Sequence, residues 1–175
     1  MKKLLFICLC PLLFSAYQQQ EDAAAMNAKK KTIFLYSFTK YIDWPPDYKE
    51  GNFVIGVFGN NPTLVSELNK MAATKMAQSQ KIEIKSLNSI ESSGKYNILF
   101  IPAESTAQSG DAIARLKGHG TLVVTEEKGM IKKGSAINFV TIESIIKFQL
   151  SIPNAEKQHL KIGRELESYA VKTND

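Results

Sequence analysis

The feature of this sequence that most constrains its fold is an apolar and aromatic segment, residues 31–46, that ends in two consecutive prolines. Its apolar residues recur at spacings of one, three and four, and therefore share one broad face of a helix: Ile33, Phe34, Phe38, Tyr41 and Ile42. Prolines cannot continue a helix, and the residue before a proline is pushed towards extended geometry. The pattern thus predicts a core helix that ends near Asp43, at a corner formed by the only tryptophan and the two prolines.

The first twenty residues have the organisation of a secretory signal peptide. Two lysines precede an apolar run at residues 4–14, and small residues then lead into a polar stretch. The apolar run is too short for a typical bilayer-spanning helix. We therefore expect residues 1–20 to be a signal peptide, cleaved at about residues 16–20, and residues 21–175 to form one exported domain. An uncleaved amphipathic anchor is the alternative.

Composition limits what the exported domain can do. Both cysteines, Cys8 and Cys10, lie in the predicted signal peptide, so the mature chain has no disulfide, no thiolate nucleophile and no cysteine metal ligand. Removing the signal peptide leaves 20 basic and 17 acidic residues, a net charge of +3. The basic residues are mostly scattered, which argues against nucleic acid as a partner. An apolar fraction of 44% is ample for the core of a single domain.

The rest of the chain predicts an α/β fold. Continuous apolar runs at residues 53–58, 96–101 and 121–125 are typical of strands buried on both faces, whereas residues 81–85 alternate as a half-exposed strand does. Helices are expected from Pro62, with Asn61 as the N-cap, and between residues 111 and 117. Short connections between these elements indicate a central, partly parallel sheet flanked by helices, a single-domain sandwich.

The C-terminal region departs from this alternation. Residues 135–140 and 145–151 look like two strands joined by a short turn, which indicates an antiparallel pair. A C-terminal helix is expected to follow, capped by Asn154 and continuing to about Val171.

No catalytic motif emerges from the sequence. The glycines after the first buried strand do not have dinucleotide-binding spacing, no phosphate-binding loop occurs, and the two S-x-x-K matches lack their partner motifs. The two histidines, His119 and His159, are not spaced as metal ligands. We therefore expect neither catalytic residues nor a metal nor a cofactor, and a binding or regulatory domain is favoured over an enzyme.

Polar residues at the ends of buried strands are candidates for ligand binding. Asn60 and Asn61 follow the first buried strand, and Glu126 and Glu127 follow the third. The carboxyl ends of strands are where open α/β sheets commonly bind ligands. Asn60, Asn61 and Glu126 are therefore our candidate ligand-binding residues.

The ordered set of motifs resembles the YfiR family of small periplasmic regulatory proteins. Four blocks carry the resemblance: residues 31–45; residues 53–62; residues 98–101 with 122–126 and Gly129; and residues 134–139 with 146–151, 160–163 and Leu166. They span nearly all of the mature chain. Well-studied members carry disulfide-forming cysteines, which the expected mature chain lacks, so redox sensing through thiols is excluded.

The resemblance implies a periplasmic α/β protein, a homodimer, that docks onto the periplasmic domain of an inner-membrane signalling protein. The implied partner is a diguanylate cyclase, whose cyclic di-GMP output it restrains, or in other lineages a sensor histidine kinase. Tyrosine and tryptophan often anchor interfaces, so the candidate partner-binding residues are Tyr41, Trp44 and Tyr48. A periplasmic small-molecule binding or sensor protein, with its site near Asn60 and Glu126, is the alternative.

Overall fold

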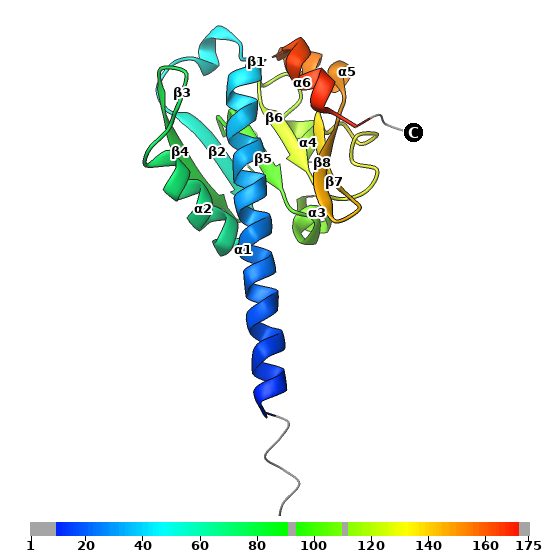
Figure 1. The fold of residues 1–175 in the computed structure, drawn as a ribbon. Coiled ribbons are helices and arrows are strands. Elements are labelled where there is room, and N and C mark those ends of the chain that lie inside the picture. Colours follow the sequence, from blue (N-terminus) through cyan, green and yellow to red (C-terminus); the bar gives the residue numbers. More distant parts are fainter. Residues whose placement is uncertain (1–9, 91–93, 110–111, 172–175) are drawn as a thin grey trace, which may run out of the picture.

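A computed structural model describes residues 10–90, 94–109 and 112–171 as an α/β domain that begins with one long helix, α1 (Cys10–Tyr41). Figure 1 shows α1 crossing in front of the sheet, with its N-terminal part extending away from it. The elements that follow are β1 (Ile42–Asp43), η1 (Pro46–Tyr48), β2 (Phe53–Phe58), α2 (Pro62–Ala72), β3 (Met76–Ala77), β4 (Gln80–Leu87), β5 (Ile98–Ile101), η2 (Ala103–Ser105), α3 (Thr106–Ser109), α4 (Ala112–Arg115), β6 (Leu122–Thr125), β7 (Ile137–Ile142), β8 (Ile145–Leu150), α5 (Ile152–Glu156), β9 (Lys161–Ile162) and α6 (Arg164–Tyr169).

The central sheet has the strand order β3-β4-β2-β5-β6-β7-β8. Neighbouring strands from β4 to β7 are parallel, and β8 returns antiparallel to β7. The very short β1 and β9 pair separately. The predicted fold class is confirmed: a mixed α/β domain with a partly parallel sheet, flanking helices, and a C-terminal antiparallel pair followed by helix.

Both faces of the sheet are covered, as the continuous apolar runs predicted. Every residue of β2, β5 and β6 is buried. Helices α1 and α2 cover the larger core on one face. A smaller core holds Phe58, Ile90, Leu99, Ile101, Ile113, Leu116, Val123 and Met130. Strands with helices on both faces have no solvent side, which is why these runs do not alternate.

The face of α1 that packs against the sheet differs from the predicted face. Leu35 and Phe38 are fully buried and Ile42 nearly so, whereas Ile33 is 65% exposed. The expectation that Ile33 belongs to the buried stripe is therefore wrong. Successive helical residues turn by about 100°, so Ile33 lies about 200° around the helix from Leu35. Three consecutive apolar residues cannot all face the core.

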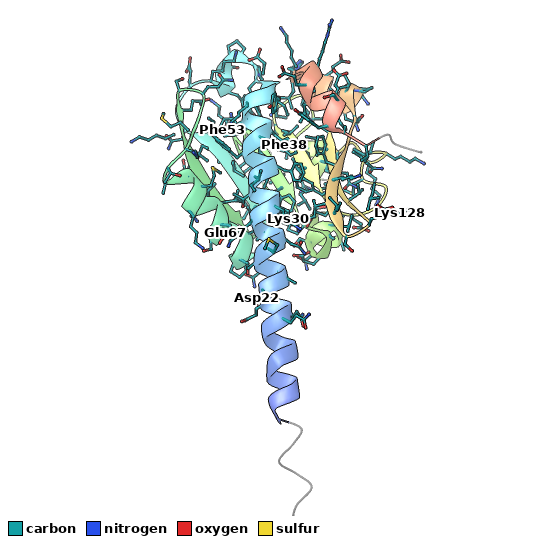
Figure 2. The ribbon with its side chains drawn as sticks, in the orientation of Figure 1. Asp22, Lys30, Phe38, Phe53, Glu67 and Lys128 are labelled. Atoms are coloured by element: carbon teal, nitrogen blue, oxygen red, sulfur yellow. The ribbon has the colours of Figure 1, made fainter. Side chains whose placement is uncertain are left out.

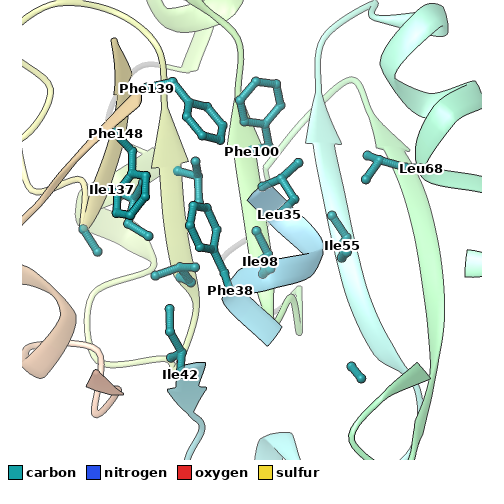
Figure 3. Close-up of a cluster of buried hydrophobic side chains, with 14 of the residues drawn as sticks. Leu35, Phe38, Ile42, Ile55, Leu68, Ile98, Phe100, Ile137, Phe139 and Phe148 are labelled. Carbon is teal, nitrogen blue, oxygen red and sulfur yellow. The ribbon is translucent and has the colours of Figure 1, made fainter. Parts of the chain in front are cut away.

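A cluster of phenylalanine side chains packs α1 against the β7–β8 pair. The Phe38 ring packs edge-on against Phe148 at 5.4 Å and stacks on Phe139 at 6.1 Å, and Phe34 lies 5.7 Å from each of these two rings. Phe100 of β5 completes the cluster, 6.1 Å from Phe139. Figure 3 shows Phe38 among Phe148, Phe139 and Phe100. Aromatic pairs add to the free energy of burial, so this cluster fixes α1 relative to the C-terminal strands.

The C-terminal region contains two short helices where one long helix was expected. Ser151 caps α5 by accepting a hydrogen bond from the Asn154 N–H, so Asn154 is not the cap. The chain turns at His159, whose φ of +58° is left-handed, and then forms β9. The predicted single helix to Val171 is therefore wrong, because residues 161–162 pair with β1.

Helix α1 is largely solvated over residues 19–27. Residues 19–24 are exposed, and Ala28 is the first buried residue among the side chains that the structure describes. In Figure 2, Asp22 lies on the extending part and Lys30 lies level with the body. None of the helices in the described residues is both long enough and apolar enough to cross a membrane. Residues 1–9 of the predicted signal peptide lie outside the described residues, and residues 10–20 form the start of α1.

The position of α1 on the sheet predicts contrasting effects of two substitutions. Leu35→Ala should lower the free energy of unfolding by about 3 kcal/mol, because it empties a fully buried site. Ile33→Ala should change it by less than about 0.5 kcal/mol, because the side chain is mainly exposed. Urea denaturation measures both. Equal losses, or a larger loss for Ile33→Ala, would contradict the observed orientation of the helix.

Candidate functional site

The Trp-Pro-Pro corner lies at the amino ends of the parallel strands, and its tryptophan points inward. Trp44 is only 4% exposed. Its Nε1 donates a hydrogen bond to the Asn97 carbonyl oxygen at 3.0 Å, and its ring packs edge-on against Phe53 at 4.9 Å. Trp44 therefore supports the corner from within, and the surface there is made by its neighbours.

Asn97 joins the corner to the sheet through both its backbone and its side chain. Its side-chain Oδ1 accepts from the Val54 N–H at 2.9 Å, and its Nδ2 donates to the Tyr48 carbonyl at 2.9 Å. The Asn97 carbonyl, which accepts from Trp44, also accepts from the Leu122 N–H at 2.9 Å. One buried residue thus links the corner to the starts of β2, β5 and β6.

Two tyrosines of the corner remain partly exposed. Tyr41 lies 6.4 Å from the ring of Tyr169, which is 64% exposed. Tyr48 packs against Gly120, where an added Cβ would lie 2.7 Å from the tyrosine ring, and Lys95 lies over that ring at 5.4 Å. Of the three candidate partner-binding residues, Tyr41 and Tyr48 contribute to the surface. Sequence reasoning missed Tyr169, whose place beside Tyr41 depends on a contact across 128 residues.

A groove of about 780 Å³ lies between the C-terminal half of α1 and the β7–β8 pair. Its walls are Asn27 and Lys31 of α1, Glu126, Lys128 and Gly129 after β6, Asn138, Phe139, Val140, Thr141, Ile142, Ser144, Ile146 and Gln149 of the β7–β8 pair, and Val171. Glu126 was predicted from its place at the end of a buried strand, and the structure brings it into this groove.

An ion pair crosses the groove. The Lys31 Nζ lies 2.5 Å from Glu126 Oε1, and the two side chains are only 19% and 13% exposed. The same Nζ lies 5.8 Å from the centre of the Phe100 ring. Partial burial makes this pair less screened by solvent than the exposed pair of Lys49 and Asp43.

The groove is also lined by two amide side chains, Asn138 and Gln149. The buried Asn138 accepts a hydrogen bond from Thr125 Oγ1 at 2.7 Å and donates one to Gln149 Oε1 at 3.3 Å. Buried amides held in this way are fixed in orientation. Asn138 is fully buried and holds the partly exposed Gln149 amide in place. The groove can therefore offer a ligand a cation, a carboxylate and the Gln149 amide beside apolar walls.

The structure places Asn60 and Asn61 in a different hollow, of about 390 Å³. Asn61 caps α2 as predicted, since its Oδ1 accepts from the Leu64 N–H at 3.1 Å. Strand β5 lies between β2 and β6 in the sheet, so the residues that follow β2 and β6 share one edge but line separate hollows. The candidate ligand-binding residues are thus divided between two places.

A shifted pKa among the described residues belongs to Glu83, which lies outside the groove. The pKa of the exposed Glu83, on β4, is lowered by a hydrogen bond from Asn52 and by the nearby Lys85. Within the described ranges, no three or more histidine, cysteine or acidic side chains gather closely enough to hold a metal ion.

The ion pair predicts coupled effects on stability. Lys31→Met should lower the free energy of unfolding by about 1–2 kcal/mol, because it leaves the largely buried Glu126 carboxylate unpaired. Adding Glu126→Gln to Lys31→Met should restore much of that loss. Chemical denaturation of the two single variants and the double variant gives the coupling energy. Strictly additive losses would contradict the interaction.

Comparison with known proteins gives one match. A family model described as YfiR/HmsC-like matches residues 28–170, from the first buried residue of α1 to the end of α6. No curated protein is similar enough to the chain to count as a match. The match covers well over half of the 175 residues and contains the aromatic corner and all the groove-lining residues except Asn27 and Val171. The chain belongs to the YfiR/HmsC-like family.

Proposed function

We propose that this protein is exported to the periplasm, binds the periplasmic domain of an inner-membrane signalling protein and restrains its output. Membership of the family implies a periplasmic regulator of diguanylate cyclase signalling, and the family is regulatory and non-catalytic. The partner we propose is a membrane-anchored diguanylate cyclase, and no reaction is proposed for the chain itself.

The observation that carries the proposal is the pair of neighbouring tyrosines at the corner, Tyr41 and the exposed Tyr169. Tyr169 presents most of its ring to solvent beside the half-buried Tyr41. Tyrosines of this kind are enriched among the residues that dominate binding energy, because they bury much area at little conformational cost. We propose Tyr41, Tyr169 and Tyr48 as partner-binding residues.

The buried groups below explain why this corner would suit a docking surface. Trp44 and Asn97 hold the turn that carries Tyr48, and the Gly163 N–H donates to the Tyr41 carbonyl at 2.8 Å, which fixes the segment leading to α6. A surface whose backbone is fixed before binding loses less conformational entropy when a partner docks.

A second candidate function is the binding of a small molecule in the groove that contains Lys31 and Glu126. It is favoured by the groove's size and by the partly exposed Gln149 amide, which the buried Asn138 holds in place. A metabolite that binds there would raise the melting temperature by mass action. A thermal-shift screen of wild type beside Glu126→Gln would separate binding in the groove from binding elsewhere.

Export and assembly belong to the same proposal. We propose cleavage of residues 1–20 as a signal peptide at about residues 16–20, which mass spectrometry of the protein from the periplasm would test. The homodimer that the family resemblance implies is tested by light scattering of the purified mature chain.

The proposal predicts that deleting the gene raises cellular cyclic di-GMP and that wild-type protein reverses the rise. Tyr169→Ala should weaken partner binding about tenfold, as expected for an interface tyrosine, and should therefore restore less of the control. Its stability should change by less than about 0.5 kcal/mol, because the side chain is mainly exposed.

Ile33→Ala is the matched control, since Ile33 is equally exposed and lies away from the corner on α1. Cyclic di-GMP is measured in the deletion strain carrying each variant, and partner binding by crosslinking and co-purification. Unchanged cyclic di-GMP on deletion, with no membrane protein recovered, would rule the proposal out. Full activity of Tyr169→Ala would show that the tyrosine corner is not the partner-binding surface.

A further inference from the structure

A small pocket of about 270 Å³ lies where α4, the turn before β7 and the end of α5 meet, and its charged side chains are all basic. It is lined by Ile113, Ala114, Lys117, Lys132, Lys133, Gly134, Asn154, Lys157 and Gln158. The pocket is separate from the groove between α1 and the β7–β8 pair and shares no residue with it. It is separate also from the tyrosine corner.

The four lysines have no anionic partner among the described residues. None of Lys117, Lys132, Lys133 and Lys157 forms an ion pair, whereas Lys31, Lys49, Lys70 and Lys85 all do. Like charges gathered around one concave surface repel one another and raise the local positive potential. That potential attracts an anion to the pocket that these lysines line.

Two buried amide side chains hold together the segments that carry these lysines. Asn154 Nδ2 donates to the Ile131 carbonyl at 2.8 Å and to the Ser135 carbonyl at 2.9 Å, which fixes the turn containing Lys132 and Lys133 against α5. Asn154 Oδ1 in addition accepts from Lys157 Nζ at 3.5 Å. The positions of three of the four lysines therefore depend on a single buried side chain.

Gln158 fixes the turn next to Lys117, and its own Nε2 remains free to donate. Its Oε1 accepts from the Gly118 N–H at 2.9 Å and the His119 N–H at 3.3 Å, next to Lys117. Because the oxygen accepts both bonds, the orientation of the amide is determined, and its Nε2 is the group left over. Gln158 is only 3% exposed, yet its Nε2 has no hydrogen-bond partner among the described residues.

We propose that this pocket binds a phosphate-bearing anion. The lysines supply positive charge from several directions, and the free Gln158 N–H supplies an oriented donor at the wall. Lysine is a common phosphate-binding residue that acts as a point charge and does not impose bidentate geometry. The volume suits a single phosphate group with associated water, so the ligand is either a free phosphate or the phosphate of a lipid headgroup.

Binding of inorganic phosphate to the purified mature protein tests the proposal, by isothermal titration at low ionic strength with chloride as the reference anion. The double variant Lys132→Ala/Lys133→Ala should weaken binding at least tenfold. The matched control, Lys75→Ala/Lys81→Ala, removes two exposed lysines that lie outside the pocket and also form no ion pair. It should change the affinity less than twofold.

Gln158→Glu provides a second, nearly isosteric test. The carboxylate keeps an acceptor for the Gly118 and His119 N–H groups, so the turn should hold, while the free donor becomes an anionic oxygen. Phosphate binding should be lost with the melting temperature maintained. Unchanged phosphate affinity in Gln158→Glu would overturn the assignment of the donor and, with it, the site.

Sedimentation with vesicles distinguishes the two sources of phosphate. Binding to phosphatidylglycerol vesicles but not to free phosphate, lost in Lys132→Ala/Lys133→Ala, assigns the site to lipid headgroups. Binding to free phosphate alone assigns it to a soluble ligand. The proposal is overturned if wild type binds neither, or if the Lys75→Ala/Lys81→Ala control loses as much binding as the pocket variant.

Discussion

The architecture depends on a set of hydrogen bonds made by one buried residue, Asn97. Its carbonyl oxygen accepts from the Trp44 indole and from the Leu122 N–H, and its side chain bonds the Val54 N–H and the Tyr48 carbonyl. A chain leaving a helix through two prolines has few backbone donors of its own, so the corner needs such an external partner. Asn97 supplies it and at the same time aligns the starts of three strands.

The two candidate functional regions lie at opposite ends of the parallel strands. The corner lies at the amino ends of the parallel strands, and the groove lies at their carboxyl ends, with α1 running between them. Lys31 of the groove and Tyr41 of the corner are ten residues apart on the same helix, about 15 Å along its axis. Because the phenylalanine cluster anchors α1 between these points, both regions are built on one fixed element.

Sequence patterns predicted the parts of the fold that depend on local chemistry. Continuous apolar runs correctly predicted the buried strands. Asn61 as N-cap and Pro62 as first helical residue correctly predicted the start of α2. The patterns failed where a long-range contact overrode them. Residues 160–166 satisfy a helical spacing, yet Ile162 pairs with Ile42 across 120 residues. The sequence did contain one warning against a continuous helix, Gly163, since a glycine inside a helical pattern disfavours the helix. The structure shows why a glycine is needed there: an added Cβ would lie 2.9 Å from the Tyr41 carbonyl oxygen.

The candidate site was predictable to a similar extent. Glu126 was found from its place after a buried strand, but nothing local pairs it with Lys31, which lies 95 residues earlier. The sequence singled out Trp44 as the only tryptophan, placed directly before two prolines. That its side chain points inward is shown only by the structure, in its hydrogen bond to Asn97. The family resemblance, by contrast, rested on the order of many motifs, and the family match confirms it.

The most direct test of the account is the stability of Asn97→Ala beside Asn52→Ala, measured by urea denaturation. Asn97→Ala leaves the Val54 N–H and the Tyr48 carbonyl without their partner, and should lower the free energy of unfolding by about 2–4 kcal/mol. Asn52→Ala removes an exposed amide bonded to Glu83 and should cost less than about 0.5 kcal/mol. Equal and small losses for the two variants would contradict the central role of Asn97.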